Sequence, residues 1–209
     1  RERVQRLVPA LNPKKVVIVG GGIAGCEAAR VLATRGHKPV VYEKSGKLGG
    51  NLIAGGMPSF KQDDHALIRY YENELKKLRV PVYLNHEMDK QSLLNEKADA
   101  VIVATGSKPK LFPLGSAPVY SASDVLLGNV KAGSKVAVIG GGLVGCETAL
   151  SLREQGKDVT IIEALPKLLA VNGPLCSANK EMLLALLPFK GIHILTNAKA
   201  SDYNGTSLT

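Results

Sequence analysis

The sequence has no tryptophan, and aromatic side chains make up only 4% of its 209 residues. Cysteine is also scarce: Cys26, Cys146 and Cys176 lie far apart and do not have the spacing of a disulfide scaffold or a zinc site. The four histidines likewise lack metal-site spacing. No apolar run approaches the ~20 residues of a membrane-spanning helix. Since no n-region, h-region and cleavage site open the chain, we expect no signal peptide. These absences predict a cytoplasmic globular protein without a disulfide framework or a metal site.

Negative charge is under-represented, with 18 aspartates and glutamates against 27 lysines and arginines, a net charge of +9. Such an excess of positive charge can indicate a protein that binds nucleic acid or an anionic membrane. The basic residues are scattered, however, and their longest cluster is Lys76 and Lys77 beside Arg79. Pyrophosphate ligands or an acidic neighbour explain the charge equally well, so we expect no nucleic-acid or membrane partner. The 45% apolar and 22% charged residues fit one or two globular domains.

Glycine is abundant, with 22 residues, and its clearest pattern is VVIVGGGIAGCEAARVLATRGHKPVVYEK at residues 16 to 44. The apolar, β-branched run at 16 to 19 predicts a short buried strand that Gly20, Gly22 and Gly25 turn into a helix. In such a loop the first glycine allows the turn and the second admits a pyrophosphate. The third lets the helix pack on its strand. The helix N-terminus then faces the anion.

The rest of this segment completes a βαβ unit. Gly36 is expected to end the helix, and residues 38 to 42 form a second strand that leads to Glu43. That acid lies about 20 residues beyond the glycines, where a carboxylate can accept hydrogen bonds from a ribose diol. Because strand, glycines, helix and acid follow in order, we predict a dinucleotide site rather than a merely structural glycine turn.

Nearly the same pattern, VAVIGGGLVGCETALSLREQGKDVTIIEA, returns at residues 136 to 164. Six of its positions keep a spacing of 120 residues: Gly20 and Gly140, Gly22 and Gly142, Gly25 and Gly145, Ala29 and Ala149, Gly36 and Gly156, and Glu43 and Glu163. Chance does not preserve such a register. The repeat predicts two Rossmann-like units with parallel sheets, an α/β fold. They would hold two dinucleotides that exchange electrons, or one dinucleotide beside a redundant unit.

Two segments between the repeats bear on the first site. Residues 44 to 60, KSGKLGGNLIAGGMPSF, show no regular pattern and are expected to be a ligand-facing glycine loop or a plain flexible loop. Asp63 and Asp64 are expected to cap a packing helix over 65 to 78.

A third segment, ADAVIVATGSKP, predicts a buried strand that stops abruptly at Thr105 and Gly106. In an open parallel sheet, ligands bind outside the carboxyl ends of the strands. We therefore add Thr105 and Gly106 to the first site.

The ordered motifs resemble those of the two-dinucleotide-binding-domain flavoproteins over about residues 15 to 165. The set is GGGIAG, then Glu43 and Lys44, KLGG, VIVATGSKP, GGGLVGCE and Glu163. The resemblance implies that the first unit binds FAD and that the second, inserted unit binds a nicotinamide cofactor. The paired cysteines of the disulfide reductases have no counterpart in the corresponding stretches, so dithiol chemistry is not expected.

Residues 6 to 50 and 121 to 149 more closely resemble the C-terminal half of the old yellow enzyme-like NADH:flavin oxidoreductases, which include the 2,4-dienoyl-CoA and enoate reductases. This resemblance implies a barrel with FMN and a 4Fe-4S cluster upstream of Arg1. The family's cluster cysteines have no counterpart here. We therefore expect the chain to be a truncated fragment on which substrate reduction itself does not occur.

The resemblance also implies a division of the chain. Residues 1 to 14 would link to the preceding part, and 15 to 108 would form a partial FAD-binding domain. The Pro- and Gly-rich residues 109 to 119 would be a linker, and 120 to 209 a partial NAD-binding domain.

Cofactor-binding residues are carried over position by position from the same resemblance. The FAD set is Gly20, Gly22, Ala24 and Gly25 at the pyrophosphate, Glu43 at the ribose, Lys44 and Met88 at the adenine, Leu48, Gly49 and Gly50 toward the flavin, and Ala104, Thr105 and Gly106 near the pyrophosphate. The NAD set is Gly140, Gly142, Leu143, Val144 and Gly145 at the pyrophosphate, Glu147 toward the nicotinamide, and Glu163 at the ribose. Glu147 has an alternative interpretation as a solvated helix residue. Glu163 would bind the 2′-hydroxyl and repel a 2′-phosphate, which favours NADH over NADPH.

The leading hypothesis is a redox module that passes electrons from NADH through FAD toward a flavin or cluster on sequence outside this chain. Hydride transfer between two cofactors needs them held in contact and needs no general acid, so no catalytic side chain is expected. Two alternatives stay open at this point: a non-catalytic module that binds ADP, and a self-contained NADH oxidase.

Overall fold

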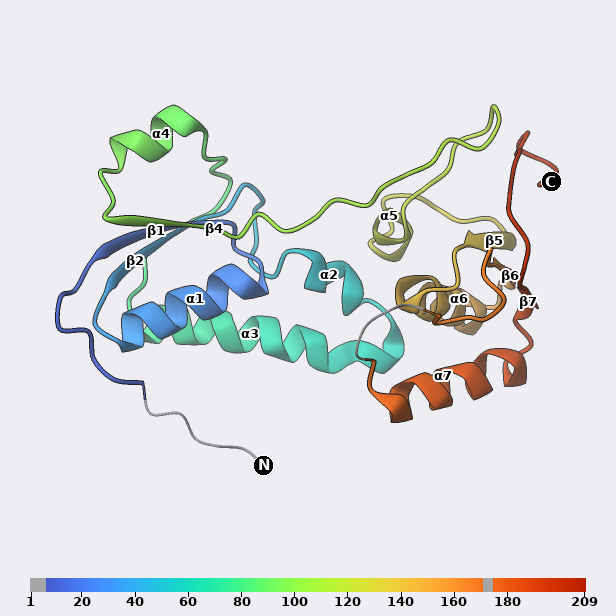
Figure 1. Cartoon of the computed structure of the whole chain (residues 1–209), viewed down its shortest axis with the longest axis horizontal. Helices are drawn as coiled ribbons and strands as arrows, with labels where there is room; N and C mark the ends of the chain where they lie inside the picture. Colours follow the sequence, from blue (N-terminus) through green and yellow to red (C-terminus); the bar gives the residue numbers. More distant parts are fainter. Residues whose placement is uncertain (1–6, 171–174) are drawn as a thin grey trace. The chain divides into compact units, whose positions relative to one another are not determined.

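A computed structural model describes residues 7–170 and 175–209 (Figure 1). The chain divides into two compact units. One comprises the residues up to Gly56 together with Lys61–Lys108, and the other comprises Met57–Phe60 and Pro109–Thr209. Each unit has a parallel sheet with helices packed against it, so the α/β class that the sequence predicts is confirmed. In the described part of the chain no helix is long and apolar enough to cross a membrane.

The first unit is built on a four-stranded sheet in the order β3-β2-β1-β4, with every pairing parallel. Its strands are β1 (Lys15–Val19), β2 (Lys38–Tyr42), β3 (Val82–Tyr83) and β4 (Ala100–Val103). Val17 and Ile18 on β1 are completely buried, as the apolar run predicts. Since the chain leaves β1 toward β2 on one side and β4 lies on the other, the carboxyl end of β1 is the switch point at which sheets of this kind bind ligands.

Helices lie on both sides of this sheet. They are α1 (Ile23–Thr34), α2 (Asn51–Gly55), α3 (Gln62–Lys77) and α4 (Lys90–Asn95), and a short 3-10 turn spans Ser59–Lys61. Figure 1 shows α1 and α3 side by side on one face, with α4 on the opposite face. The core under α1 and α3 includes Ile18, Cys26, Val41, Tyr71 and Leu75.

Three sequence expectations for this unit are wrong. Helix α3 begins at Gln62 after Lys61 without a side-chain cap, so Asp63 and Asp64 lie in its first turn, where carboxylates favour the positive end of the helix. Part of the expected loop at 44 to 60 is helical, as α2. Strand β4 is not buried, because it is an edge strand and one face of it lies open in the described residues. Val101 is 41% exposed and Val103 is 71% exposed.

The second unit has a three-stranded parallel sheet in the order β5-β6-β7. Its elements are α5 (Ala122–Leu126), β5 (Lys135–Ile139), α6 (Leu143–Glu154), β6 (Asp158–Ile162), α7 (Ser177–Phe189) and β7 (His193–Leu195). The bounds of β5, α6 and β6 lie 120 residues beyond those of β1, α1 and β2. The core joins Cys146 on α6 to Val159 and Ile161 on β6 and to Leu187 on α7. The sequence repeat is therefore a repeat in three dimensions.

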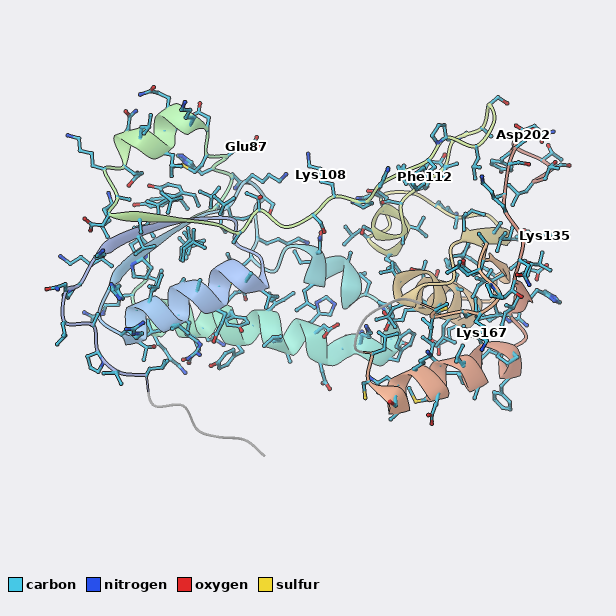
Figure 2. The ribbon with its side chains drawn as sticks, viewed as in Figure 1. Glu87, Lys108, Phe112, Lys135, Lys167 and Asp202 are labelled. Atoms are coloured by element: carbon cyan, nitrogen blue, oxygen red, sulfur yellow. The ribbon has the colours of Figure 1, made fainter. Side chains whose placement is uncertain are left out.

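Residues 104 to 120 contain no helix or strand. Figure 2 labels Lys108 and Phe112 along this segment. The Lys110 ammonium lies 5.0 Å from the centre of the Phe112 ring, which is a cation–π distance.

Candidate functional site

The first glycine loop needs glycine at Gly20 for two physical reasons. Its φ is +113°, which side chains rarely tolerate, and a Cβ atom there would collide with the carbonyl oxygen of Ala104. The Gly20 N–H donates to the Tyr42 carbonyl at 2.8 Å, so the loop is tied to the end of β2. The loop thus lies at the carboxyl ends of β1, β2 and β4, at the switch point where such sheets bind ligands.

Close packing explains the glycine at Gly25. A Cβ atom at this position would run into the carbonyl oxygen of Gly20, so helix α1 can approach β1 only with glycine here. Gly22 precedes α1 in an extended conformation, and no side chain caps the helix. The N–H groups of the first turn of α1 therefore have no side-chain cap and can donate hydrogen bonds to a bound anion.

Glu43 follows β2 and its carboxylate is clamped by two backbone N–H groups. Oε2 accepts from Gly21 at 2.6 Å and Oε1 accepts from Ser45 at 2.7 Å. The side chain is buried at 7% exposure. Burial alone would raise the pKa of Glu43, but the Ser45 and Gly21 hydrogen bonds outweigh it and hold the pKa below its usual range. The carboxylate is an oriented anion that keeps lone pairs for a ribose diol.

The glycine pair that follows packs directly on the glycine loop. The Gly49 N–H donates to the Gly21 carbonyl at 2.9 Å, and a Cβ atom on Gly50 would lie 3.0 Å from the Cα atom of Gly22. Leu48 is buried against Gly21 on the same side. The structure therefore brings the KLGG segment and the glycine loop together, as the predicted site requires.

The remaining predicted residues of the first unit lie around this loop. Ala24, Lys44, Thr105 and Gly106 are exposed, and Met88 is half-buried. The His86 N–H donates to the Glu43 carbonyl at 2.9 Å, which places the segment that leads to Met88 beside the acid. Ala104 is bonded through its N–H to the Val19 carbonyl at 2.8 Å.

The second unit repeats the clamp almost atom for atom. Glu163 Oε2 accepts from the Gly141 N–H at 2.6 Å, and Oε1 accepts from the Leu165 N–H at 2.7 Å. A Cβ atom on Gly145 would collide with the carbonyl oxygen of Gly140, as in the first loop. Gly21 and Gly141, which donate these bonds, are not among the predicted site residues, although each is the middle residue of a GGG triplet and the two lie 120 residues apart.

The two buried cysteines each contact one of the two glycine loops. The Cys26 thiol contacts the Gly21 carbonyl at 3.3 Å, and the Cys146 thiol contacts the Gly141 carbonyl at 3.4 Å. Burial is the main cause that raises the pKa of each thiol to about 11. Both are therefore neutral packing groups at neutral pH. All three cysteines are free, and the described residues hold no cluster of three or more metal-ligating side chains.

The two loops differ in their surroundings. No described residue beyond its chain neighbours lies within 4 Å of a Cβ atom built on Gly140, whereas the carbonyl of Ala104 lies against Gly20. Leu169 stands 120 residues after Gly49; it is buried and adopts φ +52°. Among the described residues, the strand side of the second loop is thus more open, and a buried leucine stands where the first unit has Gly49.

The other predicted residues of the second site lie on or beside α6. Leu143 and Val144 are exposed at its N-terminus, and Gly142 precedes the helix without a side-chain cap. Glu147 is half-buried one turn along α6.

Comparison with known proteins gives a consistent result. The family model described as pyridine nucleotide-disulphide oxidoreductase matches residues 14–208. The chain is 52% identical over 204 residues to a cinnamate reductase of Clostridium sporogenes, covering 97% of this chain and 30% of that protein. It is 43% identical over 164 residues to an NADH oxidase of Thermoanaerobacter brockii, covering 73% of this chain and 24% of that one.

A solved 2-naphthoyl-CoA reductase superposes with a TM-score of 0.89 at 33% identity, over 97% of this chain and 31% of that one. The chain therefore spans roughly a third or less of the length of the relatives it matches.

Proposed function

Because the chain belongs to the pyridine nucleotide-disulphide oxidoreductase family, we propose that it is the FAD- and NADH-binding module of an NADH:flavin oxidoreductase of the enoate or dienoyl-CoA reductase type. Electrons would pass from NADH through FAD toward an FMN and iron-sulfur part outside this chain. The observation that carries the proposal is the duplicated clamp, in which Glu43 and Glu163 each accept two backbone N–H bonds beside a glycine loop. Two such clamps provide for two adenine dinucleotides.

We assign FAD to the first unit. Its pyrophosphate would lie on the loop of Gly20, Gly22 and Gly25, with the adenine ribose on Glu43. The packing of Gly50 on Gly22 supports the assignment, because two glycines in contact leave a smooth backbone surface along which a long cofactor can extend. Thr105 and Gly106 would border the pyrophosphate from the end of β4.

NADH is assigned to the second unit. Gly140, Gly142 and Gly145 would hold its pyrophosphate, and Glu163 would accept from the ribose hydroxyls. The clamp orients this carboxylate. Beside the 2′-position of a bound nucleotide it would repel a phosphate, so NADH is favoured over NADPH. Glu147 would face the nicotinamide end.

The chain's own residues act by binding and orientation. FAD and NADH, when bound, supply the hydride and electron-transfer chemistry. The clamped carboxylates hold the two riboses, and the uncapped N-termini of α1 and α6 bind the pyrophosphates. Cys26 and Cys146 stay protonated and pack beneath the loops, so neither takes part in thiol chemistry.

The test is an absorbance titration of the purified chain. FAD is added first, and NADH is then added without oxygen to the wild type and to the matched variants Glu43→Ala and Glu163→Ala. We expect flavin bands that NADH bleaches in the wild type. Glu43→Ala should lose FAD binding, whereas Glu163→Ala should keep FAD but need far more NADH.

The opposite dependence of the two variants would reverse the assignment of the cofactors. A colourless chain that binds ADP in both units and no FAD would refute the redox role and support a nucleotide-binding module.

A further inference from the structure

The two buried cysteines carry hydrogen-bonding groups to which the proposed function gives no task beyond packing. Cys26 lies in the first turn of α1 and is 1% exposed, and Cys146 lies at the corresponding point of α6 and is fully buried. The Cys26 thiol contacts the Gly21 carbonyl oxygen at 3.3 Å, and the Cys146 thiol contacts the Gly141 carbonyl oxygen at 3.4 Å. A thiol is a weak donor and a carbonyl oxygen is an acceptor, so both contacts are S–H···O hydrogen bonds.

The carbonyl group that each thiol contacts has a second donor. The Gly21 carbonyl accepts from the Gly49 N–H at 2.9 Å, and the Gly141 carbonyl accepts from the Leu169 N–H at 2.8 Å. A carbonyl oxygen has two lone pairs, so thiol and amide together occupy both. The peptide group that joins Gly21 to Gly22 is therefore held by two separate segments of the chain.

Fixing this carbonyl also fixes the N–H group of the same peptide, which belongs to Gly22. In a trans peptide the N–H points opposite to the C=O, and the described part of the chain has no cis peptide bond. Since the Gly21 carbonyl points at the buried Cys26 thiol, the Gly22 N–H points away from that thiol. Gly22 directly precedes α1, where backbone N–H groups can donate to an anion.

We propose that Cys26 is a positioning residue, whose thiol donates to the Gly21 carbonyl and so aims the Gly22 N–H at the pyrophosphate of a bound dinucleotide. Cys146 does the same in the second unit through Gly141. The inference rests on the proposed function, because it assigns a task within the same two sites. The thiol acts through the peptide group alone, and no bond is made or broken at the sulfur.

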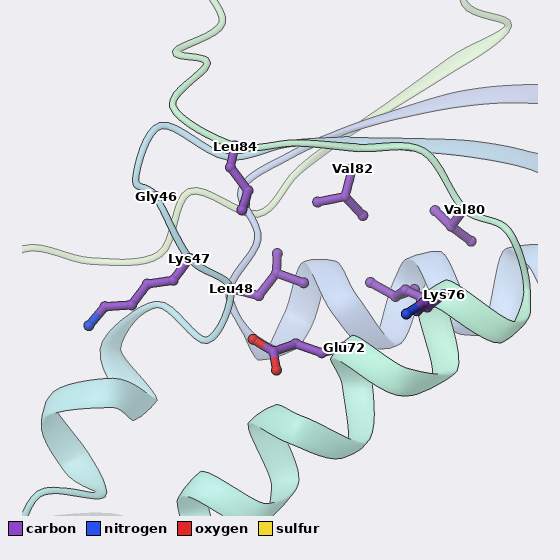
Figure 3. Close-up of a pocket in the computed structure, with 9 residues that line it drawn as sticks. Gly46, Lys47, Leu48, Glu72, Lys76, Val80, Val82 and Leu84 are labelled. Atoms are coloured by element: carbon purple, nitrogen blue, oxygen red, sulfur yellow. The ribbon is translucent and has the colours of Figure 1, made fainter.

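The surroundings of Cys26 keep its thiol protonated, as a donor must be. Burial raises the pKa of Cys26 most, and the carboxylates of Glu43 and Glu72 add to the rise, to about 11. Glu72 and Leu48 line a largely apolar cleft of about 380 Å³ between α3 and β3 (Figure 3). The Leu48 side chain also lies against Gly21, so apolar packing surrounds the hydrogen-bonded peptide on this side.

The first test needs no cofactor. Raman spectroscopy records the S–H stretching band, whose frequency falls when the thiol donates a hydrogen bond. In Cys176→Ser, which removes the exposed thiol, only Cys26 and Cys146 contribute. We expect their band below that of an alkanethiol dissolved in hydrocarbon. A band at the hydrocarbon frequency would show thiols that only pack and would overturn the proposal.

The second test separates a donor from a packing group, because serine and alanine differ by one hydroxyl. Cys26→Ala should weaken FAD binding roughly two- to tenfold, the range for one neutral hydrogen bond. Cys26→Ser should restore most of the affinity, and neither variant should change the Kd of NADH. Cys146→Ala and Cys146→Ser should show the converse pattern, and Cys176→Ser should bind both cofactors like the wild type. Equal loss of FAD affinity in Cys26→Ala and Cys26→Ser would contradict the donor role.

The amide resonance of Gly22 in the cofactor-free chain reports the peptide itself. It should move in Cys26→Ala and return toward the wild-type position in Cys26→Ser. The two proposals can fail separately. A wild type that binds neither cofactor refutes the proposed function, while the Raman band and the Gly22 resonance still decide the hydrogen bond. Normal binding of both cofactors by Cys26→Ala leaves the proposed function standing and refutes the positioning role.

Discussion

Replacing Glu43 with glutamine tests whether the clamp holds the first unit together. The wild-type carboxylate accepts from Gly21 and Ser45 at 2.6 and 2.7 Å and is 7% exposed. Glutamine keeps one acceptor oxygen but presents an NH2 group to the other backbone N–H. One hydrogen bond to a charged group is lost and a buried donor faces another donor, which costs about 1.5–3 kcal/mol.

The assay is thermal unfolding of wild type and Glu43→Gln, followed by circular dichroism at pH 7. For a unit of about 100 residues, 1 kcal/mol shifts Tm by roughly 4–8 °C, so we expect a loss on the order of 10 °C. Glu74→Gln is the matched surface control. Among the described residues the Glu74 side chain pairs with the exposed Lys77 alone, so this substitution should change Tm little. An unchanged Tm in Glu43→Gln would refute the clamp as a stabilising contact.

The same variant has a defined pH dependence. The pKa of Glu43 is lower in the folded chain than its ordinary value, so ionisation favours folding. The stability advantage of wild type over Glu43→Gln is therefore present above about pH 4.3, the ordinary pKa of glutamate. It is lost as the pH falls through the lower folded pKa. A gap in Tm that widens on acidification would contradict this reasoning.

Three further predictions follow from the second unit and from the cysteines. Gly145→Ala should destabilise the second unit by a few kcal/mol, because its Cβ atom meets a backbone carbonyl, and urea unfolding followed in that unit checks it. Glu163→Ser should reduce the preference for NADH over NADPH by roughly tenfold or more, measured as the ratio of the two Kd values. Iodoacetamide at pH 8 should label only the exposed Cys176, since burial raises the pKa of Cys26 and Cys146 to about 11; a mass increase of more than one label would contradict this.

The local elements of both units could be predicted closely from the sequence. Strand β2 spans the predicted residues 38 to 42, and α1 is followed by Gly36 at φ +87°. These features depend on neighbouring residues: β-branched runs favour strands, and a glycine after a helix takes the left-handed conformation. The resemblance to the dinucleotide-binding flavoproteins, which rests on the same local motifs, is confirmed by the family match. The individual cofactor-binding residues stay predictions.

Features that depend on distant neighbours could not be predicted in this way. Whether Val101 and Val103 are buried depends on what covers β4, and periodicity along one strand does not carry that information. The start of α3 at Gln62 likewise reflects the 3-10 turn before it rather than the two aspartates inside its first turn.

The motifs and their spacing were enough to predict two βαβ units 120 residues apart, each with a glycine loop and a following acid. The clamping of Glu43 by Gly21 and of Glu163 by Gly141, and the apolar cleft between α3 and β3, became visible in the folded chain. The difference lies in the distance along the chain over which each interaction acts. Backbone preference and hydrophobic period act over a few residues, whereas a clamp or a cleft exists only where segments far apart in the chain meet.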